Sequence, residues 1–147
     1  MAKAKVDMNA FNKSLNSLDK AFIERLDKIE KAFVKSMQDM EREATAAAPV
    51  DTGKLKQSIE WAEVGKLSYE LRANTNYAAY VEFGTGQFFK NYPGKDAYWQ
   101  DIAIRYKKNG QGKTDAQPFF YPTVDKNIAK LKNRIKTILS KNACHLI

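Results

Sequence analysis

The longest regular pattern in this sequence is FNKSLNSLDKAFIERLDKIEKAFVKSMQDMEREA, residues 11–44. Its apolar side chains recur in steps of three and four residues, and no proline precedes Pro49. The resulting stripe consists of Phe11, Leu15, Leu18, Phe22, Leu26, Ile29, Phe33, Met37, Met40 and Ala44. Its 11-residue repeat has a period of about 3.67 residues, close to that of a straight α-helix. The pattern predicts one nearly continuous helix over residues 11–44, with this stripe buried.

A helix of roughly 37 residues would extend about 55 Å, because each residue adds about 1.5 Å. A single domain of 147 residues is narrower than that. Two ways of covering the stripe remain open. The chain can fold back and pack its own sheet along the helix, or a neighbouring subunit can cover part of it.

A break and a hairpin are predicted after the long helix. In the segment PVDTG, residues 49–53, proline interrupts the helical hydrogen bonds, and Asp51 or Thr52 can cap a short following turn. Residues 58–63 and 68–73 then read as two short strands, which predicts a β-hairpin. Its expected inward-facing residues are Ile59, Trp61, Tyr69 and Leu71.

The second half of the chain is predicted to hold a helical turn, an extended loop and a second long helix. Residues 77–82 place their apolar side chains on one helical face. Residues 87–117 are polar and glycine-rich, but alternating apolar side chains predict one strand, as in half of a protruding hairpin. These side chains are Tyr98, Ile102, Ile104 and Tyr106. Pro122 suits a first helical turn, and the apolar steps from Val124 to Ile138 predict an amphipathic helix.

The predicted fold class is therefore α+β. It combines a long N-terminal helix, a small, mainly antiparallel sheet with an extended loop or hairpin, and a C-terminal amphipathic helix. We expect a single domain over residues 1–147, with residues 87–117 forming the extended loop or hairpin.

Composition excludes several classes of protein. No stretch approaches the roughly 20 apolar residues of a membrane span, and the N-terminus lacks a signal-peptide core. Cys144 is the only cysteine, so no intrachain disulfide forms, and His145 beside it leaves a zinc site short of ligands. We expect a chain made in the cytoplasm, without a membrane partner and without zinc or redox chemistry.

Positive charge is concentrated near the C-terminus. The net charge is +8, and residues 122–147 carry six Lys or Arg against one Asp. Such a segment can face nucleic acid, a membrane surface or an acidic protein ring. A solvated helix face explains the same charges more simply.

Residue types that carry out chemistry do not form a site in this sequence. Asp51, Glu82 and Asp101 lack the spacing of paired helical ligands, and loop caps or surface charges are their simpler roles. His145 lies near the end of the sequence, and the glycine clusters at 84–86 and 110–112 lack the spacing of phosphate-binding loops. We expect no catalytic residue, no tightly bound metal and no cofactor.

Aromatic and basic residues are interleaved in residues 88–108. These aromatic residues can stack on bases, anchor a protein interface or pack in an ordinary core. They are Phe88, Phe89, Tyr92, Tyr98, Trp99 and Tyr106.

Three blocks of sequence together resemble a known signature. They are APVDTGKLKQSI at 48–59, YAAYVEFGT at 77–85 and AQPFFYP at 116–122. This ordered set is similar to that of the head-tail joining proteins of tailed bacteriophages, also called neck or tail-completion proteins. With the flanking helices, the resemblance covers residues 10–140. It implies a virion protein that forms a ring in the neck between the portal or adaptor and the tail, without activity or cofactor.

Residues of these blocks have two expected roles. Some of these residues determine the backbone conformation, because glycine adopts φ and ψ angles that other residues rarely adopt and proline has a fixed φ. These structural-motif residues are Pro49, Asp51, Thr52, Gly53, Gly84, Pro118 and Pro122. The aromatic side chains of these blocks have more surface than two short strands can cover. We therefore expect them to form a subunit interface. It comprises Tyr77, Tyr80, Phe83, Phe119 and Phe120.

Two other functions remain open at this point. One is a tail-terminator ring on the tail tube. The other is a basic DNA-binding protein whose C-terminal lysines bind phosphates, and a ring could also touch DNA passing through it.

Overall fold

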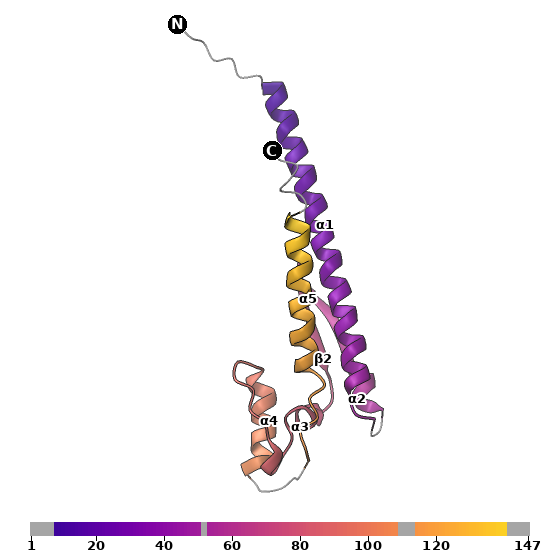
Figure 1. Ribbon diagram of the computed structural model, residues 1–147, viewed down its shortest axis with the longest axis vertical. Helices are drawn as coiled ribbons and strands as arrows, with labels where there is room; N and C mark the ends of the chain where they lie inside the picture. Colours follow the sequence, from indigo (N-terminus) through magenta and orange to yellow (C-terminus); the bar gives the residue numbers. More distant parts are fainter. Residues whose placement is uncertain (1–7, 51–52, 109–113, 141–147) are drawn as a thin grey trace.

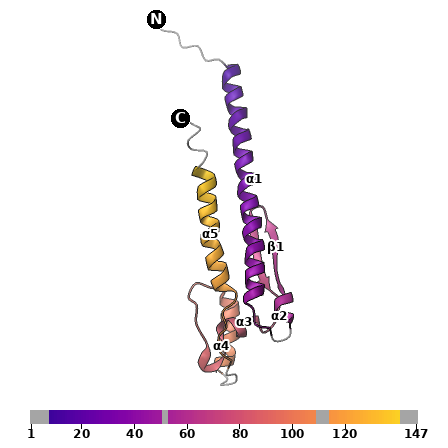
Figure 2. The ribbon, with the colours of Figure 1, turned by 45° about the vertical axis from the view of Figure 1, so that its right-hand side comes forward.

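The computed structural model describes residues 8–50, 53–108 and 114–140. Two long helices, α1 (Met8–Ala47) and α5 (Tyr121–Ser140), lie side by side and run in opposite directions (Figure 1). Shorter elements gather toward one end of the pair. They are α2 (Lys54–Gln57), β1 (Ile59–Gly65), β2 (Ser68–Ala73), α3 (Ala78–Phe83), η1 (Gly86–Phe88) and α4 (Ala97–Lys108). At the other end, α1 runs on past α5 (Figure 2).

The predicted long helix is confirmed, and its apolar stripe is only partly buried. Met37, Met40 and Ala44 are buried, whereas Leu15 is 43% exposed and Phe22 is 62% exposed. The side chains of Phe11 and Leu18 lie outside the described residues. The prediction that the whole stripe is buried is therefore wrong for the single chain. The reason is length, because α1 has 40 residues and α5, which packs beside it, has 20.

The predicted hairpin is also confirmed. Strands β1 and β2 form a two-stranded antiparallel sheet in which Trp61 pairs with Leu71 and Glu63 with Tyr69. One face lies on α1, where the Tyr69 ring stacks on Phe33 with centroids 5.6 Å apart. The hairpin thus covers part of the apolar stripe of α1. This agrees with the alternative in which the chain packs its own sheet along the helix.

The strand predicted over residues 98–106 is wrong, because these residues form helix α4. Trp99 and Ile102 are half-buried and Ala103 is buried, a spacing that places all three on one helical face. The Asp96 carboxylate caps this helix, since it accepts the backbone N–H of Tyr98 at 2.9 Å. Residues 87–117 are consequently not one extended loop or hairpin, because they contain α4 and part of η1.

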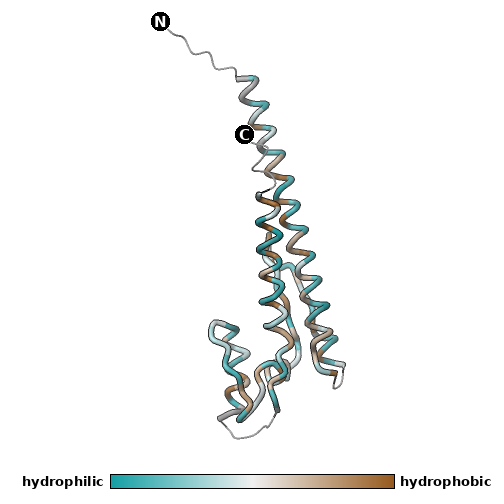
Figure 3. Tube along the Cα trace, in the orientation of Figure 1, coloured by the Kyte–Doolittle hydropathy of each residue, from teal (hydrophilic) through white to brown (hydrophobic). Residues whose placement is uncertain are grey.

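The core lies where the C-terminal end of α1 meets the hairpin, α3 and the beginning of α5. It consists of Ala44, Ala48, Leu55, Ile59, Ala73, Ala78, Ala79, Phe83, Ala103, Phe119, Phe120 and Tyr121. Figure 3 shows apolar segments along both long helices as well, beyond this core. Among the described helices, none has the length and hydropathy that a membrane crossing requires.

Candidate assembly surfaces

A buried carboxylate joins two of the three sequence blocks. Glu82, on α3, is fully buried. Its Oε2 accepts the backbone N–H groups of Phe119 at 2.8 Å and Phe120 at 2.9 Å, and its Oε1 accepts that of Tyr121 at 3.1 Å. Tyr121 is the first residue of α5, and Phe119 and Phe120 directly precede it, so the carboxylate lies at the N-terminus of the helix, where negative charge is favoured. Glu82 is therefore a buried helix cap, which corrects its expected role as a surface charge or loop cap.

Gly84 allows the chain to turn directly after this carboxylate. Its φ of 73° and ψ of 178° are accessible essentially only to glycine. A Cβ atom there would lie 2.5 Å from the carbonyl oxygen of Phe88 and 2.8 Å from the nitrogen of Ala116. Close by, the backbone N–H of Gln117 donates to the carbonyl of Val81 at 2.7 Å. The expectation that Gly84 holds a special backbone shape is confirmed.

The remaining structural-motif residues have varied positions. Gly53 adopts a left-handed conformation with φ of 73° before α2, which confirms its expected role. Asp51 and Thr52, the predicted caps, lie outside the described residues. Pro118 is half-buried, and Pro122 is exposed in the first turn of α5, as predicted.

The predicted interface aromatics belong mostly to the core of the subunit itself. Phe83 and Phe119 are at most 1% exposed and Phe120 is 8% exposed, while Tyr77 and Tyr80 are half-buried. The covering surface comes from α4 and the preceding segment. Tyr92 lies 5.5 Å from the Phe83 ring and Trp99 lies 5.0 Å from the Phe120 ring. The expected interface role is therefore wrong for Phe83, Phe119 and Phe120, which are buried within the subunit with cover from residues 89–103.

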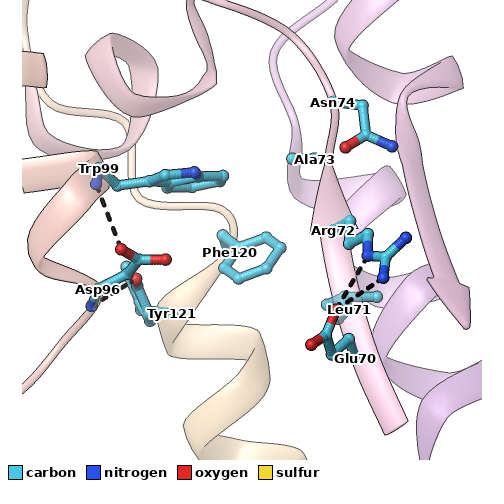
Figure 4. A pocket seen from close by; sticks show the side chains of 9 residues that line it. All are labelled: Glu70, Leu71, Arg72, Ala73, Asn74, Asp96, Trp99, Phe120 and Tyr121. Atoms are coloured by element: carbon cyan, nitrogen blue, oxygen red, sulfur yellow. Dashed lines mark hydrogen bonds and ion pairs between the residues drawn. The ribbon is translucent and has the colours of Figure 1, made fainter. Parts of the chain in front are cut away.

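A cleft of about 410 Å³ separates β2 from α4 and the beginning of α5 (Figure 4). Its two carboxylates are engaged, since Glu70 pairs with Arg72 at 2.8 Å and Asp96 caps α4. The described residues contain no group of three His, Cys, Asp or Glu side chains placed to hold a metal.

The outer edge of β2 lines this cleft. The Asn74 N–H donates to the Ser58 carbonyl, which makes these two residues a hydrogen-bonded pair of the sheet. Hydrogen-bonded and non-hydrogen-bonded pairs alternate from there along the two strands. In the antiparallel register, the backbone groups of Leu71 and Ala73 therefore point away from β1. Such an open edge has the hydrogen-bonding groups that pair with a further strand.

Ion pairs connect the two long helices. Arg134 of α5 donates to the Ser36 hydroxyl at 2.9 Å and lies 3.4 Å from the Asp39 carboxylate. Glu43 faces Lys126 at 3.1 Å and Lys130 at 3.6 Å. Much of the positive charge of α5 is thus matched by carboxylates of α1.

These contacts shift the pKa values of both carboxyl groups. Burial opposes the charged form of Asp39, but hydrogen bonds from Lys35 and Arg134 outweigh it and hold its pKa below the ordinary value. The hydrogen bond from Lys126 is the main reason why the pKa of Glu43 is also lowered. Both groups consequently favour the charged form in the folded chain.

Comparison with known families identifies the first half of this architecture. Residues 9–84, just over half of the chain, match the HK97-gp10-like family, described as "Bacteriophage HK97-gp10, putative tail-component". The chain belongs to the HK97-gp10-like family. The comparison with curated proteins gave no match, and the comparison with solved structures gave none either. The resemblance to a phage head-tail joining family is thereby confirmed at the level of a phage tail component.

The region matched to the HK97-gp10-like family ends at Gly84, two residues after the buried Glu82. It spans α1, the hairpin and α3, whereas α4 and α5 follow it. The partners of the Glu82 carboxylate, Phe119 to Tyr121, are in the part beyond the match. In this HK97-gp10-like chain, the family region and the C-terminal helix are thus joined through one carboxylate.

Exposed apolar side chains are a further feature of this HK97-gp10-like chain. Several gather on the N-terminal half of α1, and others lie along α5. Leu15, Phe22 and Ile23 are 43%, 62% and 64% exposed, and Ile128 and Leu139 are 39% and 49% exposed. The predicted interface residues therefore miss the apolar surfaces that the folded subunit presents.

Proposed function

We propose that this chain is a virion structural subunit that forms a homo-oligomeric ring in the phage neck, joins the head to the tail and completes the tail. Its proposed partners are further copies of itself, portal or adaptor proteins and tail proteins. The match of residues 9–84 to a phage tail-component family carries the proposal. The order of the three sequence blocks favours the neck among the positions within a virion.

The shape of the subunit supports an assembling protein. The long helix α1 runs past the end of α5 (Figures 1 and 2). The part that projects carries exposed apolar side chains, among them Leu15 and Phe22. Large exposed apolar surface on a subunit is typical of a contact with another protein. The carboxylates of Glu82, Asp39 and Glu43 all hold the fold together, and we propose no enzymatic role.

A phage that carries a nonsense mutation in this gene tests the proposal. We expect its lysate to contain DNA-filled heads and complete tails that have not joined. Adding the purified protein to this lysate should restore infectious particles, as counted by plaques and by electron microscopy. Joined, infectious particles in the unsupplemented lysate would rule out a neck function.

Two alternative functions give different outcomes in the same lysate. A tail-terminator ring would leave tails of uncontrolled length, because such a ring stops polymerisation of the tail tube. A DNA-binding role is favoured by Lys132 and Lys136, which are exposed on α5 and form no ion pair among the described residues. Phosphate binding would weaken steeply as salt increases, whereas an apolar ring contact would not.

A further inference from the structure

Two helix faces of the subunit have the same pattern of apolar residues. On α1, Leu15, Phe22 and Leu26 follow one another in steps of seven and four residues. On α5, Ile128, Ile135 and Leu139 repeat these steps. We call these sets the α1 strip and the α5 strip. Each spans 11 residues, or about 16 Å of helix, so one strip has the length needed to cover the other.

Both strips are only partly covered within the subunit, since Leu26 and Ile135 are half-buried. Leu15 and Phe22 are 43% and 62% exposed, and Ile23 beside them is 64% exposed. On α5, Ile128 and Leu139 are 39% and 49% exposed. Five of the exposed large hydrophobic residues thus lie on or beside two helix faces. Scattered surface residues need no partner, but strips of this kind indicate a contact surface.

Opposite charges accompany the two strips. Asp19 lies one helical turn from both Leu15 and Ile23, and it is exposed. Lys132 lies one turn after Ile128, and Lys136 follows one turn later. None of these three charged groups forms an ion pair among the described residues. The charge on α1 is therefore complementary to the charges on α5.

We propose that the α1 strip of one subunit packs against the α5 strip of a second copy of this chain. The inference rests on the proposed ring and names the contact that builds it. In a ring of many subunits, neighbours are related by a small rotation, so we place α1 and the adjacent α5 close to antiparallel, as they are within the subunit. With Leu15 beside Leu139 and Leu26 beside Ile128, Asp19 lies within about one turn of both lysines.

This arrangement is heterologous, because each subunit presents two different faces. The neighbour's α5 covers the N-terminal half of α1, while the subunit's own α5 packs beside the C-terminal half. A second copy is favoured over another partner because one chain contains both faces, with equal length and opposite charge.

A charge-exchange experiment tests the contact. The variants are Asp19→Lys, the double variant Lys132→Glu/Lys136→Glu, and the triple variant that combines them. Sedimentation velocity and native mass spectrometry over a concentration series measure self-association. We expect each charge change alone to weaken association at least tenfold, and the triple variant to return to within about threefold of the natural chain. Glu24→Lys, a matched charge reversal on the opposite face of α1, should leave association unchanged.

A second variant probes the apolar part of the contact. Phe22→Asp should abolish association without changing the melting temperature, because Phe22 is 62% exposed in the subunit. Circular dichroism checks that the variant remains folded.

The possible outcomes separate this contact from the proposed function. The proposed contact is overturned if the natural chain remains monomeric at high concentration or if Phe22→Asp associates normally. It is also overturned if the triple variant associates no more strongly than the Asp19→Lys and Lys132→Glu/Lys136→Glu variants. Loss of duplex DNA binding in the Lys132→Glu/Lys136→Glu variant, with self-association intact, would also overturn it. In each of these cases, a protein that still restores the defective lysate retains the neck function. Association through this contact in a protein that does not restore the lysate would instead contradict the neck function.

Discussion

The Oε2 atom of Glu82 lies 2.8 Å from the backbone nitrogen of Phe119, 37 residues further along the chain. The same carboxylate accepts two more backbone N–H groups, so one side chain caps the N-terminus of α5 and attaches it to α3. Hydrogen bonds to a charged, buried acceptor are stronger than those between neutral groups.

Replacement of this carboxylate should therefore destabilise the subunit strongly. We expect Glu82→Gln to lower the free energy of unfolding by about 2 kcal/mol, since an amide has one acceptor oxygen where the carboxylate has two. Glu82→Ala should lower it by about 4 kcal/mol, because three buried N–H groups lose their acceptor. Urea denaturation followed by circular dichroism measures both values. The exposed Glu63→Gln is the control and should remain within about 0.5 kcal/mol.

Two glycines with the same φ of 73° should respond differently to alanine. Gly53→Ala introduces a Cβ with no atom within 4 Å, so only the left-handed backbone costs free energy, about 1 kcal/mol. Gly84→Ala places a Cβ 2.5 Å from a backbone oxygen and should cost at least about 3 kcal/mol. Equal effects in thermal denaturation would show that the turn at Gly84 is not rigid.

The buried aromatics should control stability in the isolated subunit. Phe83→Ala removes a fully buried ring, and we expect a loss of about 3–5 kcal/mol in the free energy of unfolding. Tyr98→Ala is a suitable control, because Tyr98 is 72% exposed. If the Phe83 variant unfolds at the same denaturant concentration as the natural chain, the aromatic cluster does not hold the subunit together.

Acid should weaken the α1–α5 contact. The folded-state pKa values of Asp39 and Glu43 are lowered from ordinary values of 3.8 and 4.5, so their ion pairs stabilise the fold fully above these values. The stabilisation is lost as the pH falls through the lower folded-state values, because the unfolded chain then binds more protons. We expect the free energy of unfolding to decrease below about pH 4.5. In the Asp39→Asn/Glu43→Gln variant, this decrease should be smaller, and an unchanged pH dependence would exclude these two groups as its source.

Local patterns predicted most of the fold. The periodicity between Phe11 and Ala44 predicted α1, because helical spacing is a property of neighbouring residues. Helix α4 was missed because Ile102 and Ile104 also satisfy the alternation of a strand. The better signal was Asp96, a capping residue directly before the helix.

The Glu82 cap could not be predicted from local patterns, because its partners are distant in sequence. One signal was present, since Glu82 is the only charged residue between Ala73 and Phe89. A single charge within such an apolar and uncharged stretch favours a buried, hydrogen-bonded carboxylate. The interface aromatics were misassigned for a similar reason, because the rings that cover them belong to the segment read as a loop.

Electron cryomicroscopy of the purified virion shows directly whether this subunit forms a ring at the head-tail junction. The proposed function predicts a ring of this subunit between the portal or adaptor and the tail tube, recognisable by the antiparallel α1–α5 pair. Virions without this subunit at the head-tail junction, or with its ring elsewhere on the particle, would contradict the account.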